Sequence, residues 1–82
     1  MKIINSKTDK FLIQCVELDL YDILYDFASG QITNAVLQTD NLLKKYKSAG
    51  AIKDYHIVKI STTSIEVDIY IPRKIRIKCQ IP

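Results

Sequence analysis

Residues 65–81 read Ile-Glu-Val-Asp-Ile-Tyr-Ile-Pro-Arg-Lys-Ile-Arg-Ile-Lys-Cys-Gln-Ile, and this stretch decides the fold. Apolar residues occupy every second position on each side of Pro72, which is typical of two strands that each bury one face. If both apolar rows share one face, the numbers of paired residues have an even sum, which excludes a two-residue turn. A three-residue loop over 72–74 satisfies this condition. The predicted pairs are Ile71 with Ile75, Ile69 with Ile77 and, on the solvated face, Asp68 with Lys78.

A further strand is predicted at about 55–61, directly before this hairpin, and the loop Ser61-Thr62-Thr63-Ser64 joins the two. The predicted pairs across this loop are Ile60 with Ile65 and Val58 with Val67. This register turns His56 toward Ile69 and the apolar face. A neutral imidazole in the core is therefore the expected role of His56, the one histidine of the chain.

Upstream of these strands, the spacing of apolar residues changes from that of a strand to that of a helix. Apolar residues recur at spacings of three, four and seven, and polar or basic residues fill the opposite side. The apolar set is Ile32, Ala35, Val36, Leu42, Leu43 and Tyr46. Lysines at 44, 45 and 47 suit the negative end of the helix dipole, and Gly50 is a natural residue just after a helix. We expect this helix at about 31–48.

The N-terminal part of the chain combines strand-like and helix-like patterns. Residues 2–4 and 11–18 are rich in apolar and β-branched types, and we expect at least 11–18 to be a strand, with a polar turn over 5–10. Over 19–27, apolar residues at helical spacings favour a short helix over a strand. The predicted fold is α+β, with one main amphipathic helix and the short second helix packed on a small antiparallel sheet of 3–5 strands.

Length and charge narrow the classes of protein further. The 82 residues allow a single domain over 1–82. Residues 1–41 hold three basic and six acidic residues (3 − 6 = −3), and residues 42–82 hold nine and three (9 − 3 = +6), which gives the net charge of +3. Such asymmetry is typical either of a basic face for nucleic acid or of opposite faces through which copies of one protein associate. No apolar stretch approaches the roughly 20 residues of a membrane span, and no signal peptide is visible, so we expect no membrane partner.

No combination of residues typical of an enzyme is present in the sequence. One histidine gives no Ser–His–acid triad with a second base, and two isolated glycines form no phosphate-binding loop. Asp19, Asp22 and Asp26 share a helical face that could hold a divalent ion, although a solvated helix face is the commoner explanation. We therefore predict no catalytic residues, no metal and no cofactor.

Cys15 and Cys79 lie far apart in apolar stretches, without a CxxC spacing. The sequence favours two buried, reduced thiols, but it does not decide whether a disulfide bridge joins them. With His56 they offer no adjacent pair of ligands, so a zinc site is rejected.

Basic residues at one end and on the wet face of the last hairpin form a candidate nucleic-acid patch with one tyrosine. The patch residues are Tyr70, Arg73, Lys74, Arg76 and Lys78. A net charge of +3 is modest, and no nucleic-acid motif accompanies the patch. Charged residues on such a strand also protect a sheet edge against unwanted pairing. Nucleic acid is therefore the less favoured partner.

Several short motifs follow the main helix in a fixed order. They are Gly50-Ala51-Ile52-Lys53-Asp54-Tyr55-His56-Ile57-Val58, then Val67-Asp68-Ile69-Tyr70-Ile71, then Pro72, then Ile75 and Ile77. In this order, residues 32–82 resemble the C-terminal domain of contractile phage tail sheath proteins, as a sheath-core-like helix plus β-meander, while residues 1–31 match no part of it. The chain departs from that family in its length, in the short loop over 61–64, and in the proline directly after Ile71.

The resemblance implies assembly by strand addition, because terminal arms of tail sheath subunits add as strands to the sheets of their neighbours. It implies a non-enzymatic structural protein of a contractile phage tail or related injection apparatus, present in the virion and, during assembly, in the host cytoplasm. Its partners would be copies of itself and other tail or baseplate proteins. The expected strand-addition residues are Ile75, Ile77, Cys79 and Ile81, and the expected charged registration residues are Asp68, Arg76 and Lys78. The alternatives are a small nucleic-acid-binding module that uses the basic hairpin and a small phage protein that binds and inhibits a host protein.

Overall fold

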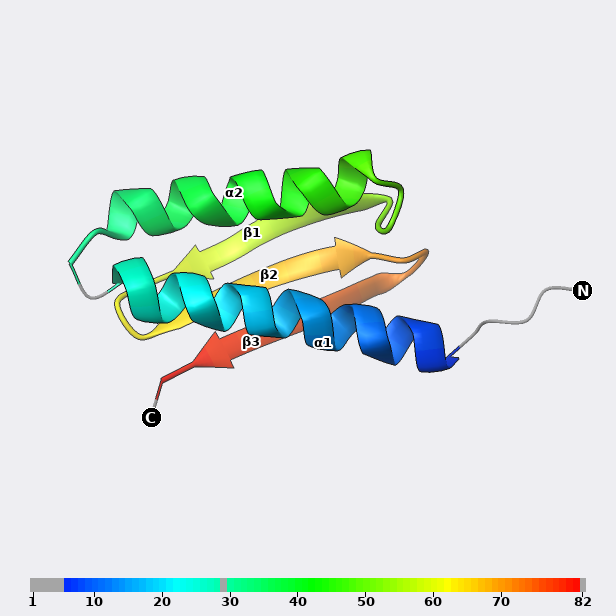
Figure 1. The fold of residues 1–82 in the computed structure, drawn as a ribbon, viewed down its shortest axis with the longest axis horizontal. Helices are drawn as coiled ribbons and strands as arrows, with labels where there is room; N and C mark the ends of the chain where they lie inside the picture. The colour runs from blue at the N-terminus through cyan, green and yellow to red at the C-terminus, as the bar shows by residue number, and fades with distance from the viewer. Residues whose placement is uncertain (1–5, 29, 82) are drawn as a thin grey trace, which may run out of the picture.

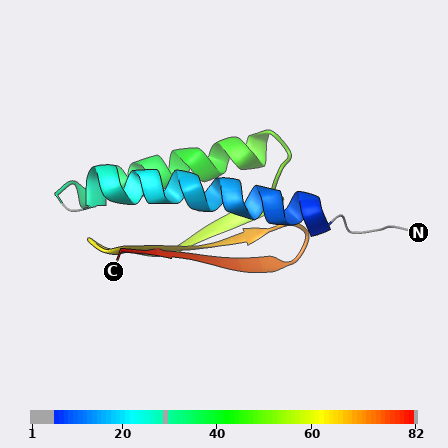
Figure 2. The same ribbon diagram turned by 60° about the horizontal axis from the view of Figure 1, so that its bottom comes forward.

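The computed structural model describes residues 6–28 and 30–81, and their order is helix, helix, strand, strand, strand (Figure 1). The elements are α1 (Ser6–Ile23), the π-helical turn η1 (Leu24–Ala28), α2 (Ile32–Ser48), β1 (Asp54–Ile60), β2 (Ser64–Tyr70) and β3 (Lys74–Gln80). The strands form one antiparallel sheet in the order β1-β2-β3. Both helices cover the same face of this sheet (Figure 2). The α+β fold with helices on a small antiparallel sheet is therefore confirmed.

The largest correction concerns α1, since the strand predicted over 11–18 and the turn predicted over 5–10 are wrong from Ser6 onward. One helix runs through both segments and continues into the helix predicted over 19–27, which is confirmed in type. The residues that α1 and η1 bury in the core stand at helical spacings. They are Val16, Leu20, Ile23 and Leu24. The burial of this row overrides the local preference of β-branched residues for strands. The strand predicted over 2–4 lies outside the described residues.

The helix predicted at 31–48 is confirmed as α2, and its end follows the expected chemistry. The N–H of Ala49 bonds to the carbonyl of Lys45 at 2.9 Å, and Gly50 follows with φ of +81°, a conformation that glycine adopts without strain. The buried residues of α2 are Ala35, Thr39 and Leu43. Val36, which the pattern assigned to the apolar face, is exposed.

The β2–β3 hairpin has the predicted faces but a register shifted by two residues. Ile69 pairs with Ile75, and Asp68 pairs with Arg76 instead of Lys78. The cause is the loop, which spans residues 71–73 and is closed by the Ile71 N–H bonding to the Arg73 carbonyl at 3.1 Å. The sums of paired numbers stay even, so every side chain keeps its expected side of the sheet.

The β1–β2 pairing contains a β-bulge that changes which face His56 occupies. Ile60 pairs with Ile65 as predicted, but the register shifts between Ile57 and Lys59, and Val67 therefore pairs with Ile57. The extra residue, Val58, is exposed, and the bulge reverses the faces of all β1 residues that precede it. His56 is thus exposed and opposite Asp68, so the predicted core role of this histidine is wrong.

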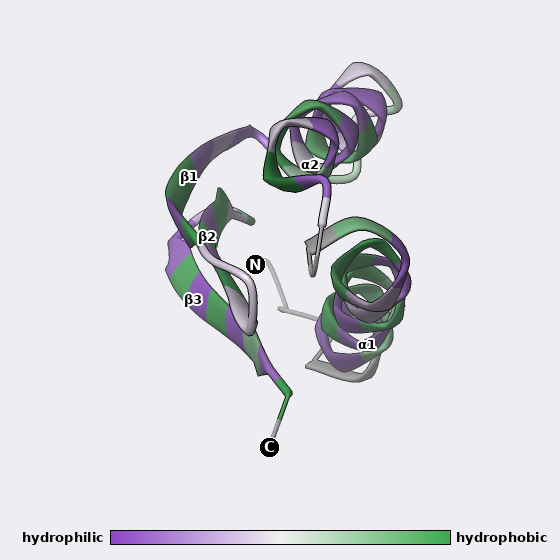
Figure 3. Ribbon diagram, turned by 90° about the vertical axis from the view of Figure 1, so that its left-hand side faces the viewer, coloured by the Kyte–Doolittle hydropathy of each residue, from purple (hydrophilic) through white to green (hydrophobic). Residues whose placement is uncertain are grey.

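The hydrophobic core lies between the helices and the sheet. Figure 3 shows hydrophobic and hydrophilic residues alternating along the strands, with the helices on one side of the sheet only. The core residues from the strands are Ile65, Val67, Ile69, Ile77 and Cys79. No helix formed by the described residues covers the other face of the sheet, which carries mainly polar and charged side chains. Among residues 6–28 and 30–81, no helix is long and apolar enough to cross a membrane.

Candidate assembly edge and open sheet face

β3 is an edge strand, because within the described residues it pairs with β2 on one side and with no strand on the other. Two bonds show how its backbone is oriented. The Ile81 N–H bonds to the Thr63 carbonyl at 2.8 Å, and the Ile71 N–H bonds to the Arg73 carbonyl at 3.1 Å. Both bonds belong to pairs of odd-numbered residues, and hydrogen-bonded pairs alternate along an antiparallel ladder. Even-numbered residues therefore turn their N–H and C=O groups away from β2; they are Lys74, Arg76, Lys78 and Gln80.

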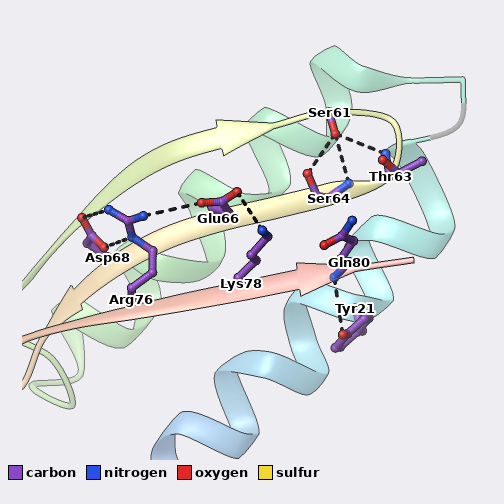
Figure 4. Close-up of polar contacts among 9 residues, drawn as sticks. All are labelled: Tyr21, Ser61, Thr63, Ser64, Glu66, Asp68, Arg76, Lys78 and Gln80. Atoms are coloured by element: carbon purple, nitrogen blue, oxygen red, sulfur yellow. Dashed lines mark hydrogen bonds and ion pairs between the residues drawn. The ribbon is translucent and has the colours of Figure 1, made fainter. Parts of the chain in front are cut away.

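One end of this edge is closed by a side chain from α1. The Gln80 N–H donates a hydrogen bond to the Tyr21 hydroxyl at 3.4 Å (Figure 4). This contact has the geometry expected from the ladder, since Gln80 is one of the residues whose N–H points outward. The segment 74–78 remains as the part of the edge along which another strand could pair. We call residues 74–78 the assembly edge.

The side chains predicted to insert into a neighbour pack mainly inside their own chain. Ile77 and Cys79 are buried in the core, and Ile75 and Ile81 are half-buried against it. The groups of β3 that a partner strand could bind are therefore those of its backbone. The apolar side chains of β3 are buried or half-buried within the chain.

Both cysteines are free thiols, which answers the question of a bridge between them. The sulfur of Cys79 lies 3.7 Å from the Glu17 carbonyl oxygen, beneath α1. Burial raises the pKa of Cys79 to about 11, so this thiol is neutral at physiological pH. Cys15 is half-buried.

The predicted charged registration residues form ion pairs within the chain, on the sheet face without helices (Figure 4). Arg76 donates from Nε and Nη2 to the two carboxylate oxygens of Asp68, and its Nη1 lies 3.5 Å from Glu66 Oε1. Lys78 Nζ lies 3.9 Å from Glu66 Oε2. The hydrogen bond from Arg76 lowers the pKa of Asp68, which favours the charged form of a carboxylate that is 4% exposed.

Each acidic residue of β2 on this face stands between basic residues of the two edge strands. Asp68 is opposite His56 in β1 and Arg76 in β3. Glu66 is opposite Lys59 and Lys78 in the same way. Sequence reasoning missed Glu66 and Lys59, although the alternation of charges along β2 was the signal that could have located Glu66.

The candidate nucleic-acid patch is only partly free. Arg76 and Lys78 face carboxylates of β2, whereas Arg73 and Lys74 are exposed at the hairpin end. Tyr70 is half-buried opposite Lys74. The carboxylates offset part of the positive potential that phosphate binding needs.

The aspartates of the first helical segment serve different purposes. Asp19 accepts a hydrogen bond from the Tyr46 hydroxyl at 2.8 Å, which ties α1 to α2. Burial, together with this contact, raises the pKa of Tyr46 to about 12. Asp22 and Asp26 are exposed. In the part of the chain that the structure describes, no group of three or more His, Cys, Asp or Glu side chains is arranged to hold a metal ion.

The fold and the edge define a two-layer α+β domain with an open sheet edge. No family model, no curated protein and no solved structure matches the chain.

Proposed function

We propose that the chain is a non-enzymatic structural protein of a contractile phage tail or related injection apparatus, and that it assembles by strand addition at the assembly edge. The observation that carries this proposal is the outward orientation of the N–H and C=O groups at Lys74, Arg76 and Lys78. The resemblance of residues 32–82 to tail sheath C-terminal domains supplies the biological setting. In that setting the protein resides in the virion and, during assembly, in the host cytoplasm.

The residues around the edge specify the strand that would fit it. On the helix side, Ile75 and Ile81 are half-buried at the border of the core, so apolar side chains of an added strand would extend the core beneath α1. On the open side, the added strand would lie beside Lys74, Arg76 and Lys78, which favours acidic residues at alternate positions. The partner strand is therefore expected to alternate apolar and acidic residues, and to come from a copy of the chain or from another tail or baseplate protein.

The predicted registration role of Arg76 changes, because its charge is already paired within the chain. Its guanidinium already binds Asp68 and Glu66, so reversing the charges of Arg76 and Lys78 together would gather like charges on one face and perturb the fold. A backbone substitution at the assembly edge tests strand addition more directly.

Lys78→Pro provides this test. Proline removes the outward N–H of residue 78, while the bonds from β3 to β2 come from odd-numbered residues and are retained. Lys78→Ala is the matched control, because it removes the same ammonium group and keeps the N–H. Circular dichroism is the control that checks whether both variants are folded.

The readout is size-exclusion chromatography with light scattering, followed by negative-stain electron microscopy. We expect the wild type and Lys78→Ala to form rings, tubes or other large species, and Lys78→Pro to lose them. Equal assembly of the proline and alanine variants, or a wild type that never forms species larger than a dimer, would contradict strand addition at this edge.

A further inference from the structure

Three segments that are far apart in the sequence enclose a cleft at one end of the molecule. The N-terminal part of α1, the loop over 49–53 and the β2–β3 loop lie together at this end (Figure 1 and Figure 2). Between them are two hollows of about 420 and 470 Å³. The hollows share lining residues from all three segments, so they form one continuous cleft. We call it the end cleft, and its lining includes Asp9, Phe11, Gly50, Lys53, Ile71 and Pro72.

Backbone hydrogen bonds fix the two loops of the end cleft. The Lys53 N–H donates to the Tyr70 carbonyl at 2.7 Å, and the Ile71 N–H donates to the Arg73 carbonyl at 3.1 Å. Just after α2, the Ala51 N–H bonds back to a carbonyl of the last helical turn at 3.0 Å. A ligand that binds here therefore meets loops whose backbone is already ordered, which lowers the entropy cost of binding.

Basic side chains without a carboxylate partner stand beside the end cleft. Lys53 lines it, and Arg73 and Lys74 directly follow Pro72 at its rim. All three basic residues are exposed, and none forms an ion pair with a described residue. The basic residues further along β3 differ, because they bind carboxylates of β2. The uncompensated positive charge of the hairpin therefore lies at this end.

Two carboxylates lie near these basic residues, at positions that leave the loop side of the cleft positive. Asp54 follows Lys53, but it has its own counter-ion, since Lys47 Nζ lies 3.3 Å from its carboxylate. Asp9 lines the cleft from the side of α1. A carboxylate disfavours a phosphate at that side, but it accepts a hydrogen bond from the amino group of a nucleic-acid base.

Phe11 gives the α1 side of the cleft an exposed aromatic ring. Its side chain lines the cleft and is nevertheless 67% exposed. Single-stranded nucleic acid is bound by this combination, because its bases stack on aromatic rings while basic side chains contact its phosphates. A duplex offers no unstacked base to the ring, and an acidic polypeptide has no base at all. The residues of the end cleft therefore favour a single strand over these other polyanions.

We propose that the end cleft binds single-stranded nucleic acid, with a base stacked on Phe11 and phosphates bound by Lys53, Arg73 and Lys74. This activity goes beyond the proposed strand addition and does not rest on it, because Phe11 and Lys53 lie outside the assembly edge. Variants of Phe11, Lys53 and Arg73 test it while residues 74–78 stay unchanged.

The first test measures the phosphate contacts. Fluorescence anisotropy of a labelled single-stranded DNA of mixed sequence, titrated with the full chain at several salt concentrations, gives the affinity. Three phosphate contacts on a single strand predict a slope of about −2 for the logarithm of the association constant against that of the salt concentration. Lys53→Gln and Arg73→Gln should each weaken binding and reduce the size of this slope by about 0.7. Lys59→Gln, which removes an exposed lysine at the far end of β1, is the matched control and should change neither.

The second test measures stacking on Phe11. Phe11→Leu keeps an apolar side chain but removes the ring, and it is expected to weaken binding about tenfold. Phe11→Tyr keeps the ring and should bind as the wild type does. Tyr25→Leu removes an aromatic ring that is 62% exposed in η1, away from the end cleft, and should leave binding unchanged. Circular dichroism checks that each variant is folded.

Four results would overturn the proposal. The first is a wild-type chain that does not bind the single strand at low salt. The second is an equal loss in Lys59→Gln and Lys53→Gln, which would mean that only net charge matters. The third is a folded Phe11→Leu variant that binds as well as the wild type. The fourth is binding of the annealed duplex, or of polyglutamate, as tight as binding of the single strand.

Discussion

Thr39 offers a test of how polar atoms are accommodated in the core. Its side chain is fully buried in α2, at 0% exposure, and its hydroxyl has no hydrogen-bond partner among the described residues. Burying a hydroxyl without a partner costs about 1–3 kcal/mol in proteins. Valine has nearly the same shape and a similar helix propensity, so Thr39→Val removes this cost without opening a cavity. We expect the free energy of unfolding to rise by about 1–2 kcal/mol, which raises Tm by roughly 4 °C or more in a domain of this size.

Urea unfolding followed by circular dichroism at a fixed protein concentration measures this change. The midpoint should rise with an unchanged slope, as expected when stability alone is altered. Thr33→Val, on the exposed side of the same helix, is the matched control and should change the stability by no more than about 0.5 kcal/mol. A Thr39→Val protein that is as stable as the wild type, or less stable, would refute the reasoning that the hydroxyl is unsatisfied.

Two further predictions concern titrating groups. Because Arg76 lowers the pKa of Asp68, the stability from this carboxylate is present above its unfolded pKa of about 3.9 and is lost as pH falls through the lower folded value. Asp68→Asn should therefore lose less stability than the wild type on acidification below about pH 4, and identical pH profiles would contradict the assignment. Because burial raises the pKa of Cys79 to about 11, iodoacetamide at pH 8 should modify Cys15 before Cys79, as mapped by peptide mass spectrometry. Equal rates at both cysteines would contradict the buried position of Cys79.

The hairpin shows what a period of two can determine from sequence and what it cannot. The alternation in residues 65–81 correctly assigned each side chain to one face of the sheet, because a shift of one residue would reverse all of them. It did not predict that Asp68, on the face without helices, is buried. A shift of two residues leaves every face unchanged, so the pattern could not distinguish Asp68 opposite Lys78 from Asp68 opposite Arg76. The position of the loop around Pro72 decided between them.

His56 shows how one inserted residue changes the chemistry of a whole strand. The sequence does contain a signal for the bulge, since Ile57 and Val58 are adjacent apolar residues and Ile60 follows at a spacing of three from Ile57. A regular strand places Ile57 and Ile60 on opposite faces, whereas a bulge at Val58 places both toward the core. With the bulge, His56 joins the charged face opposite Asp68.

The first helix could not be assigned from local preference alone. Phe11 and Leu18 are exposed and Val16 is buried, so hydrophobicity along 11–18 resembled an unbroken strand. The buried row of α1 becomes visible only when 11–18 is joined to 19–27, because Val16 and Leu20 then lie one turn apart on a single helix. The exposed apolar residues Phe11 and Leu18 are the ones that misled the assignment.

The sequence predicted which strand contains the assembly edge, but not which of its backbone N–H and C=O groups point outward. Basic residues such as those that alternate with isoleucine over 74–81 are typical of an edge strand. Which backbone groups point outward, however, depends on the register, and the register depends on the loop. The structure assigns the outward groups to the even-numbered residues, whereas sequence reasoning had chosen the odd-numbered side chains. Those side chains are the ones that bind the strand to its own helices.

Tyr21 limits the length of the strand that the assembly edge can accept. Its hydroxyl accepts the outward N–H of Gln80, just beyond the assembly edge, and its ring stacks on that of Tyr25 in η1. A strand added along the whole of β3 would need the Gln80 N–H and would displace Tyr21, which removes the support of Tyr25. A strand that ends opposite Lys78 leaves both contacts intact. If strand addition holds, the added strand is therefore expected to end opposite Lys78, because a longer strand loses both contacts of Tyr21.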